Sequence, residues 1–392
     1  MEARRPWTLS CGVVLLAALA PACFDWGAYE PVAGTTSTSG EGAGGAAGQG
    51  GSGGGGGGLP DCTGDAFECL SDGTARECVG GNWQSLGPCP LGCDEGERAC
   101  SVPSNVGAEQ VGEGTGAADV PSGGGDTIFD TDTGEITVDG TVLRPAGEGV
   151  DGDTGIAFAT QAQGSGEPGL GVFAMTGLTV QAGGVLRGTG ANALVLLVSG
   201  DVQIDGQITV ATADHQAGPG GFAGGAVGTA GDGPCAGQVG TGTYPGDNCT
   251  SGGGGAGYAG QGGPGGASDC TAPDDHSGGS GGPATCGTPE LVPLVGGSGG
   301  AGGVVAGTNP ASQPGPGGGG GGALQISAGG TITVSGTGAI HAGGGGGGEA
   351  NEAGGAGGGS GGALLLEAPV VTIAVGAVLA ANGGGGGAGD CN

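Results

Sequence analysis

The sequence contains no lysine, and six arginines are its only Lys or Arg side chains against 37 acidic residues. The formal net charge of −31 repels the phosphate backbone of DNA and RNA, which excludes nucleic acid as a partner. The same charge repels anionic lipid headgroups, so attachment to a membrane has to be covalent or hydrophobic. A phosphate-cradling P-loop is also excluded, because its motif requires a lysine.

Large side chains are scarce as well. Aromatic residues make up 3% of the chain and there are two methionines, whereas glycine occupies 112 of the 392 positions. A conventional core therefore cannot extend through the whole molecule, and ordered parts must pack Val, Ile, Leu and Ala in thin layers. The glycines show no strict Gly-X-Y period, which excludes collagen.

Residues 1–22 have the features of a secretory signal peptide. Arg4 and Arg5 precede the apolar run CGVVLLAALA, which is too short to span a bilayer. The leader ends in the letters LAPAC, which resemble a bacterial lipobox in which Cys23 would be cleaved and diacylated. The same letters contain an ordinary signal-peptidase site, so simple secretion is the alternative. We expect an extracytoplasmic protein of the bacterial cell envelope, at the outer membrane or cell surface, with Cys23 as its lipidation site.

Two segments of contrasting composition follow the leader. Residues 23–60 are rich in Gly, Ser and Thr and cannot bury apolar area, which predicts a flexible tether. Residues 61–101 are too short to fold by hydrophobic burial alone, but they contain an even number of cysteines. In an oxidising compartment this pattern predicts a disulfide module, with a zinc site as the alternative. Its cysteines are Cys62, Cys69, Cys78, Cys89, Cys93 and Cys100.

Trp83 lies in this module, and we expect it to form the module's small core. Stacking of the Trp83 ring on a carbohydrate is the alternative interpretation.

A glycine-rich insert at 216–322 contains four more cysteines, Cys235, Cys249, Cys270 and Cys286. Their spacing suggests two short loops, closed by pairing Cys235 with Cys249 and Cys270 with Cys286. Cross-links lower the entropy of the unfolded chain where side-chain burial cannot stabilise the folded one. We therefore expect partial order, in which extended, polyproline-II-like glycine strands pack backbone to backbone. Disordered loops are the alternative. If Cys23 is lipidated, one thiol stays unpaired, for which Cys391 is the candidate.

The C-terminal half of the chain repeats. Segments that start at Ala193, Ala323 and Ala363 begin with Ala-Leu and continue with alternating apolar residues, and a weaker copy starts at Leu178. Alternation with a period of two indicates strands with one buried face, and a single copy cannot bury that face alone. We therefore expect the copies to stack on one another, with a β-sandwich as the alternative.

This pattern resembles the parallel β-helices of bacterial surface adhesins and of proteins that act on polysaccharides. Together with the leader and the glycine content, it is similar to a glycine-rich bacterial surface lipoprotein. The resemblance implies an all-β fold in which a parallel β-helix, or solenoid, carries glycine-rich inserts. Its first units would lie within an acidic β region at 120–215 and the others within 323–392, on either side of the insert at 216–322.

Acidic residues provide the only weak candidates for chemistry. Asp201, Asp205 and Asp214 lie on or just past one repeat, and a glycoside hydrolase needs two such carboxylates beside the scissile bond. In the strand frame, Asp201 and Asp205 share the outward face, where acids usually serve solubility. A polysaccharide lyase would need a basic partner, and Arg144 and Arg187 are isolated in the sequence.

A second acidic group lies at 127–138, where two β-branched runs flank a turn and predict a hairpin. Asp130, Asp132 and Glu135 superficially resemble a calcium loop, but the distal ligands of such a loop are missing. We interpret them as turn residues and expect no cofactor, with calcium as the alternative.

The sequence therefore predicts a non-enzymatic cell-surface lipoprotein with an adhesive or envelope-structural role. One alternative is an extracellular carbohydrate-active enzyme, a polysaccharide hydrolase or lyase, on a β-helix. Another is a glycan- or protein-binding module displayed on a spacer. The expected partners are a membrane through the lipid anchor and an extracellular glycan or another surface protein.

Overall fold

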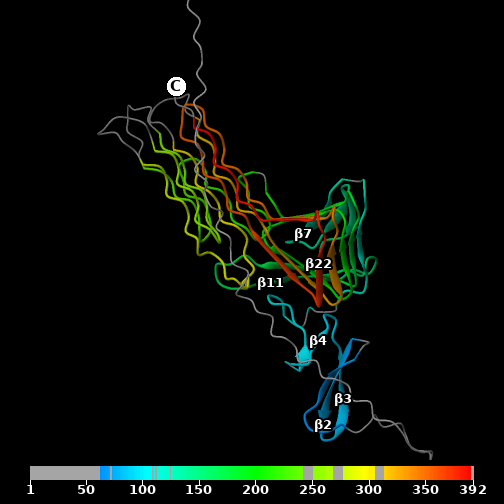
Figure 1. Ribbon diagram of the computed structural model, residues 1–392. Coiled ribbons are helices and arrows are strands. Elements are labelled where there is room, and N and C mark those ends of the chain that lie inside the picture. The colour runs from blue at the N-terminus through cyan, green and yellow to red at the C-terminus, as the bar shows by residue number, and fades with distance from the viewer. Residues whose placement is uncertain are drawn as a thin grey trace, which may run out of the picture. The chain divides into compact units, whose positions relative to one another are not determined.

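The computed structural model describes residues 62–389, apart from positions 71–72, 97, 108–109, 111–112, 124, 213, 242–249, 268–276 and 305–312. All described residues belong to one compact unit of the chain, which begins at Gly58. Their regular secondary structure consists of β-strands (Figure 1). Among these residues there is no α-helix, and so none long and apolar enough to cross a membrane. The predicted all-β class is confirmed.

Four successive stretches of the chain each contribute one strand to each of three sheets. We call them repeats I to IV. Repeats II, III and IV start at the predicted Ala193, Ala323 and Ala363, whereas repeat I starts at Leu170, one strand before the weaker copy predicted from Leu178. The strands are β12 (Leu170–Met175), β13 (Leu178–Val180) and β14 (Val185–Thr189) in repeat I; β15 (Ala193–Val198), β16 (Val202–Ile204) and β17 (Gln207–Thr209) in repeat II; β18 (Ala323–Ala328), β19 (Thr331–Val334) and β20 (Ala339–His341) in repeat III; and β21 (Ala363–Glu367), β22 (Val370–Ile373) and β23 (Val378–Ala380) in repeat IV.

Equivalent strands of successive repeats pair in parallel and in register. Val202 in β16 pairs with Leu178 of repeat I and with Ile332 of repeat III, and Ile332 pairs in turn with Val371. In repeats I to III the alternating apolar residues are buried in one cluster, against which Leu364 and Leu366 of repeat IV pack. The opposite face of the first sheet packs in a second cluster. Strands of successive copies therefore form parallel sheets, and the period of two in the sequence accounts for their buried face.

The repeat I end of the sheets is closed by shorter strands. These are β6 (Ala118–Val120), β7 (Thr127–Asp130), β8 (Ile136–Val138), β9 (Thr141–Arg144), β10 (Gly149–Val150) and β11 (Ala157–Gln161). Strands β7 and β8 pair antiparallel, which confirms the predicted hairpin. Gly134 in its turn has a positive φ of 76°, and a Cβ there would lie 2.3 Å from the Phe158 ring. Phe129 and Phe158 both pack against Phe173, so aromatic side chains fill this closed end.

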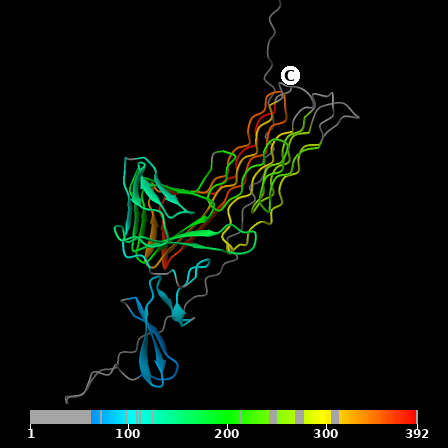
Figure 2. The same ribbon diagram turned by 180° about the vertical axis from the view of Figure 1, so that it is seen from behind.

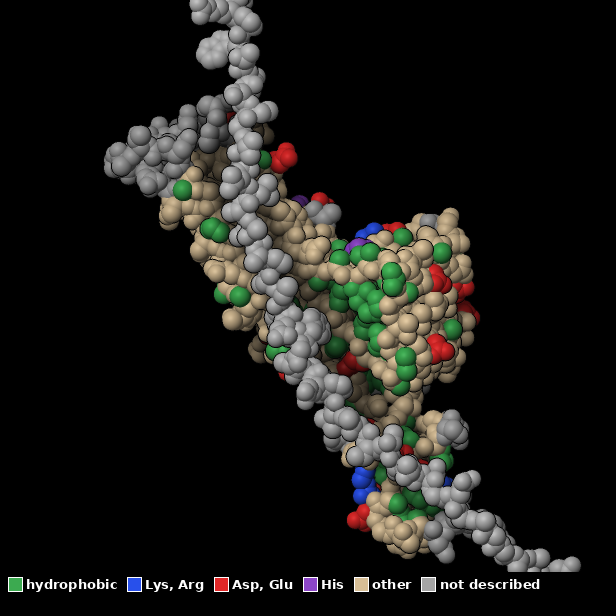
Figure 3. Space-filling model, viewed as in Figure 1, with side chains coloured by type: hydrophobic (Ala, Val, Ile, Leu, Met, Phe, Trp, Pro, Cys, Tyr) green, Lys and Arg blue, Asp and Glu red, His purple; other side chains and the backbone are tan. Residues whose placement is uncertain are grey.

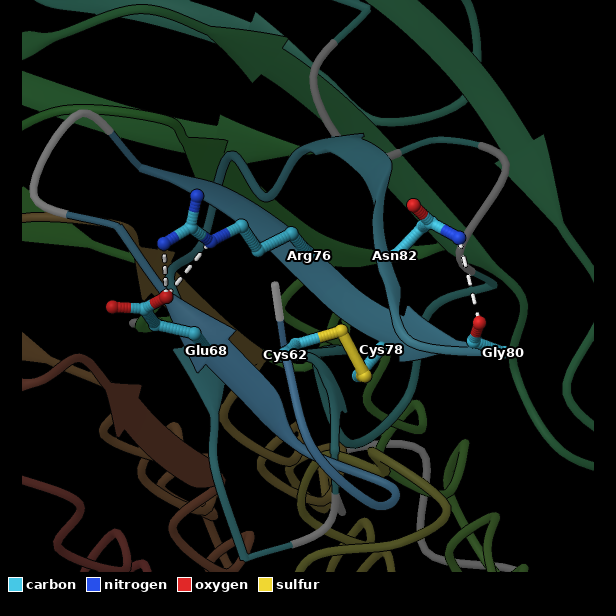
Figure 4. Close-up of a disulfide and its surroundings, with 6 residues drawn as sticks. All are labelled: Cys62, Glu68, Arg76, Cys78, Gly80 and Asn82. Carbon is cyan, nitrogen blue, oxygen red and sulfur yellow. Dashed lines mark hydrogen bonds and ion pairs between the residues drawn. A yellow bond between two sulfur atoms is a disulfide. The ribbon is translucent and has the colours of Figure 1, made fainter. Parts of the chain in front are cut away.

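The cysteine module has a three-stranded antiparallel sheet of β1 (Phe67–Cys69), β2 (Thr74–Val79) and β3 (Asn82–Pro88), and a short pair of β4 (Cys93–Asp94) and β5 (Ala99–Cys100). Three disulfides confirm the predicted framework: Cys62–Cys78, Cys69–Cys93 and Cys89–Cys100. Figure 4 shows the first of them beside the β1–β2 strands.

The core of this module differs from the expectation. Its fully buried residues include Ala75 and Cys78, whereas Trp83 is only half-buried. The Trp83 ring lies under the guanidinium of Arg76, 4.5 Å from its centroid, and Arg76 Nε donates a hydrogen bond of 2.7 Å to Glu68 (Figure 4). Because disulfides hold the strands together, the module does not need Trp83 as its centre.

The glycine-rich stretches form an ordered block that we call the glycine bundle, made of the described residues in 214–322, 342–362 and 381–389. Its extended segments run side by side in both views (Figures 1 and 2). They belong to no sheet, but backbone amides of one segment donate to carbonyls of others throughout the block. Order of the glycine inserts, with amides paired between neighbouring backbones, was the favoured interpretation, and it is confirmed.

The direction of these hydrogen bonds repeats every three residues. In the segment 252–257, the amides of Gly252 and Gly255 donate to carbonyls of 263–266, those of Gly253 and Ala256 to carbonyls of 355–358, and those of Gly254 and Gly257 to carbonyls of 235–238. Three neighbours reached in rotation, without a bond inside the segment, is the arrangement expected of a helix with three residues per turn, as in polyproline II.

Glycine is required in this block because the backbones approach so closely. A Cβ on Gly320 would lie 1.9 Å from the carbonyl oxygen of Gly297, and one on Gly254 would lie 2.1 Å from that of Ser280. Both contacts are with backbone atoms, which cannot rotate away as a side chain can.

The disulfide of the bundle joins Cys235 to Cys286, across a sequence separation of 51 residues. The predicted pairing of Cys235 with Cys249, and with it that of Cys270 with Cys286, is therefore wrong; Cys249 and Cys270 themselves lie outside the described residues. The reason is the hydrogen bonding between segments of the glycine bundle. Gly257 donates to the carbonyl of Cys235, and Cys286 donates to that of Tyr258, so one glycine segment brings both cysteines together.

We expect Gly320→Ala to lower the free energy of unfolding by about 2 to 3 kcal/mol, because the added methyl group forces two backbones apart. The matched control is Gly266→Ala in the same bundle, where a Cβ meets no atom within 4 Å. That change should alter stability by less than about 1 kcal/mol. Urea denaturation followed by circular dichroism measures both losses of stability. Equal effects of the two substitutions would contradict the close backbone packing of the glycine bundle at Gly320.

Peptide mapping of the unreduced protein should recover Cys235 linked to Cys286. Replacing both cysteines by serine should cost up to about 4 kcal/mol, because the bond closes a long loop in the unfolded chain. The denaturation assay above measures the loss, with Cys391→Ser as a cysteine control that leaves the bond intact. Recovery of a peptide that links Cys235 to Cys249 would contradict the pairing.

Candidate functional site

The predicted pair Asp201 and Asp205 flanks β16 at its two corners. Val202 and Ile204 between them are buried, as the strand frame requires. Asp201 Oδ1 accepts the backbone N–H of Thr331 in repeat III at 2.7 Å, and Asp205 Oδ1 accepts Gln203 Nε2 at 2.8 Å. Both carboxylates therefore stabilise corners of the fold.

Asp214 lies past β17, where the chain enters the glycine bundle. Its side chain is exposed, and its backbone carbonyl accepts the N–H of Gly319 at 2.9 Å. A hydrolase would need its two carboxylates to face one bond. Among the described residues, the hydrogen bonds of Asp201, Asp205 and Asp214 join each of them to other parts of the fold and none of them to another.

The hairpin acids also stabilise turns. Asp130 Oδ1 accepts the N–H groups of Asp132 at 3.0 Å and Thr133 at 2.9 Å. The carboxylate of Asp132 accepts the N–H of Ala191 at 2.9 Å, and the Glu135 carbonyl accepts the N–H of Asp130. These bonds are those of a side chain that mimics a backbone turn, which supports the turn interpretation.

Metal binding was the alternative for these acids. Among the residues that the structure describes, no three or more His, Cys, Asp or Glu side chains are grouped so that they could hold a metal ion. The sequence also has an Asp-Asp-His run at 274–276, which lies outside the described residues.

Arg144 at the end of β9 is the side chain whose role the sequence did not indicate. It is 2% exposed, and its guanidinium donates to five backbone carbonyls at distances between 2.7 and 3.1 Å, those of Gly134, Pro145, Gly147, Gly149 and Ile156. Burial lowers the pKa of Arg144, and the charge of Asp151 opposes this by raising it. All five N–H donors are used, so this cation holds the closed end of the sheets together.

The described residues of the glycine bundle enclose a groove of about 570 Å³, which we call the glycine groove. It lies between the segments 250–267, 353–359 and 383–389, and no charged side chain lines it. A second hollow of about 420 Å³ shares Ala256, Gln261 and Gly383 with it and reaches Leu364 at the start of repeat IV.

Unused backbone donors line this groove. Within the described residues, the amides of Gly263, Gly266, Gly383 and Gly386 donate to no carbonyl, and a Cβ on Gly263 or Gly266 would meet open space. The groove can therefore hydrogen-bond an extended backbone, as the other glycine segments do. Nothing in the local sequence distinguishes these glycines from those in the interior of the glycine bundle, so the groove could not be predicted from the sequence.

Comparisons with known proteins add no relative: no protein-family model matches the chain, and no curated protein and no solved structure matches it either. The site is therefore interpreted from its own geometry.

We expect Arg144→Lys to lower the free energy of unfolding by about 3 kcal/mol, since an ammonium group cannot satisfy five carbonyls arranged around a planar guanidinium. The control is Arg187→Lys. Arg187 pairs with Asp126, but its side chain is 41% exposed, so the loss should stay below about 1 kcal/mol. Thermal unfolding distinguishes the two, and an Arg144→Lys protein as stable as wild type would contradict the role.

Proposed function

We propose that the protein is an exported, non-enzymatic surface lipoprotein with an adhesive or envelope-structural role. Its body would be a parallel β-helix, in which repeats I to IV are successive turns. The in-register parallel pairing of β13, β16, β19 and β22, and of their counterparts in the other two sheets, supports this description.

The glycine bundle is the observation that carries the proposal. It devotes a large part of the chain to a block whose interior contacts are made by peptide backbone, and catalysis needs positioned side chains. Close packing with an amide partner in each direction makes such a block rigid. A rigid block with few reactive groups suits a spacer, scaffold or contact surface.

The disulfides support export. Three disulfides lie within the cysteine module and one lies within the glycine bundle. Such bonds persist in oxidising compartments outside the cytoplasm. A lipid on Cys23, directly after the leader, is the attachment that this chain's acidic charge allows. The carbohydrate-active alternative is weakened because the carboxylates of Asp201 and Asp205 are engaged in corner hydrogen bonds.

A detergent-partitioning experiment tests the anchor. In a bacterial host, the wild-type protein should enter the detergent phase with a mass increase of one diacylglycerol on Cys23. Cys23→Ser should move it to the aqueous phase, and attachment of the producing cells to a surface should fall with it. Cys391→Ser is the control, because it removes a cysteine but leaves the anchor in place.

An unmodified wild-type chain in the aqueous phase would sink the anchor. Release of sugar fragments from a polysaccharide by the purified protein, lost in Asp201→Asn, would overturn the non-enzymatic part.

A further inference from the structure

Repeat IV leaves the β body open at one end. Strands β21, β22 and β23 are each the last strand of their sheet, so each has an edge without a partner strand among the described residues. The inward side chains of repeat III, Ile332 and Ile340, are 0% exposed, whereas their counterparts Val371 and Leu379 are 39% and 38% exposed. The core is therefore cut off at this end.

The open end is an apolar surface. Figure 3 shows hydrophobic side chains gathered over β22 and its surroundings. Ile373, which pairs with the buried Val334, belongs to the same inward row at 51% exposure. Val370 at 53% and Val375 at 102% exposure lie beside this row. A contiguous apolar patch together with unpaired strand edges marks a site of association.

Charge selects the same surface. The chain has a formal net charge of −31, so two copies repel each other through most of their faces. Residues 353–389, which hold repeat IV, the later part of the bundle segment before it and the segment after it, contain Glu367 as their single charged side chain, and Glu349 and Glu352 precede them. That carboxylate accepts hydrogen bonds from Ser327 at 2.8 Å and Gln325 at 2.9 Å.

The opposite end of the body differs in its core: Val142, Leu143 and Val150 on its outer strands are about half exposed, but the core beneath them is covered. Arg144 and the β7–β8 hairpin close it, and the phenylalanines beneath them are buried. In a head-to-tail contact only one of the two ends would contribute an exposed core. Association of like ends buries the exposed core of both copies, and it produces a closed dimer.

The glycine groove belongs to the same layer. Its wall 383–389 follows directly on β23, and the amides of Gly383 and Gly386 are unused among the described residues. The edge of this segment in one copy has the free backbone groups and the lack of Cβ atoms that the groove of a second copy requires.

We propose that two copies of this chain associate end to end through repeat IV, as a twofold dimer. The unpaired edges of β21, β22 and β23 lie against those of the second copy, and the apolar residues around Val371 and Ile373 become buried. The segments 381–389 of the two copies pack on each other's glycine grooves. A second copy is the occupant because it supplies apolar side chains, strand edges and a glycine edge on one face of low charge, whose acidic side chains are Glu367 and the neighbouring Asp94 and Glu95 of the cysteine module.

Sedimentation equilibrium of the exported chain tests the dimer. All proteins carry Cys23→Ser and Cys391→Ser, so that neither a lipid nor an intermolecular disulfide joins copies, and loss of the anchor does not affect the result. The wild-type surface should give twice the chain mass. Val370→Glu with Val375→Glu should raise the dissociation constant at least about thirtyfold, because the association would bury unpaired charges.

The matched control is Val142→Glu on β9, an equally exposed valine, 52% exposed, at the closed end. It should leave the dimer intact. Gly386→Val provides a second variant, since its Cβ would lie 3.6 Å from its nearest neighbour within the chain, the carbonyl oxygen of Ala356, and it should weaken the dimer without unfolding the monomer. Unchanged circular dichroism checks folding of each variant. A monomeric wild type, a double variant that stays dimeric, or a control that dissociates would each overturn the proposal.

Discussion

Contact between bare peptide backbones is the constraint on which this structure depends. Ordering a glycine costs more conformational entropy than ordering any other residue, so a block of glycines is stable only if its amides are paired and its backbones are close. Both conditions exclude a Cβ at the contact. A Cβ on Gly320, for example, would lie 1.9 Å from the carbonyl oxygen of Gly297. The composition of the inserts is thus a steric requirement of their packing.

The β repeats provide what the glycines lack, which is a fixed register. Bundle segments continue directly from strands, and their hydrogen bonds keep a constant offset of 38 positions after β20 and β23: Gly344 donates to Asn382, Gly347 to Gly385 and Ala350 to Ala388. A glycine segment has no side-chain pattern with which to select its neighbour. The apolar alternation of the strands selects it, and the segments extend that choice outward.

This dependence explains which features were predictable from the sequence. The strands of the repeats and the β7–β8 hairpin follow from local periodicity and turn residues. The pairing of Cys235 with Cys286 does not, because it depends on which glycine segments become neighbours in space. Arg144 is isolated in the sequence for the same reason. Its five carbonyl partners come together only when the loop after β9 folds back. The unused amides of the glycine groove have no local sequence signal at all.

The positions of the acidic side chains also depend on the packing of the glycine bundle. Acidic side chains such as Asp130, Asp132 and Asp201 accept backbone hydrogen bonds at corners, where they satisfy amides that no strand can reach. Within the bundle, a carboxylate would need space that the lattice does not have. Most acids of the repeats and the bundle therefore lie at corners and in loops, and Glu367 is the one charged side chain of residues 353–389. The low charge of repeat IV and its glycine segments is thus a consequence of close backbone packing in the glycine bundle. It leaves two acidic molecules a surface on which they repel each other little.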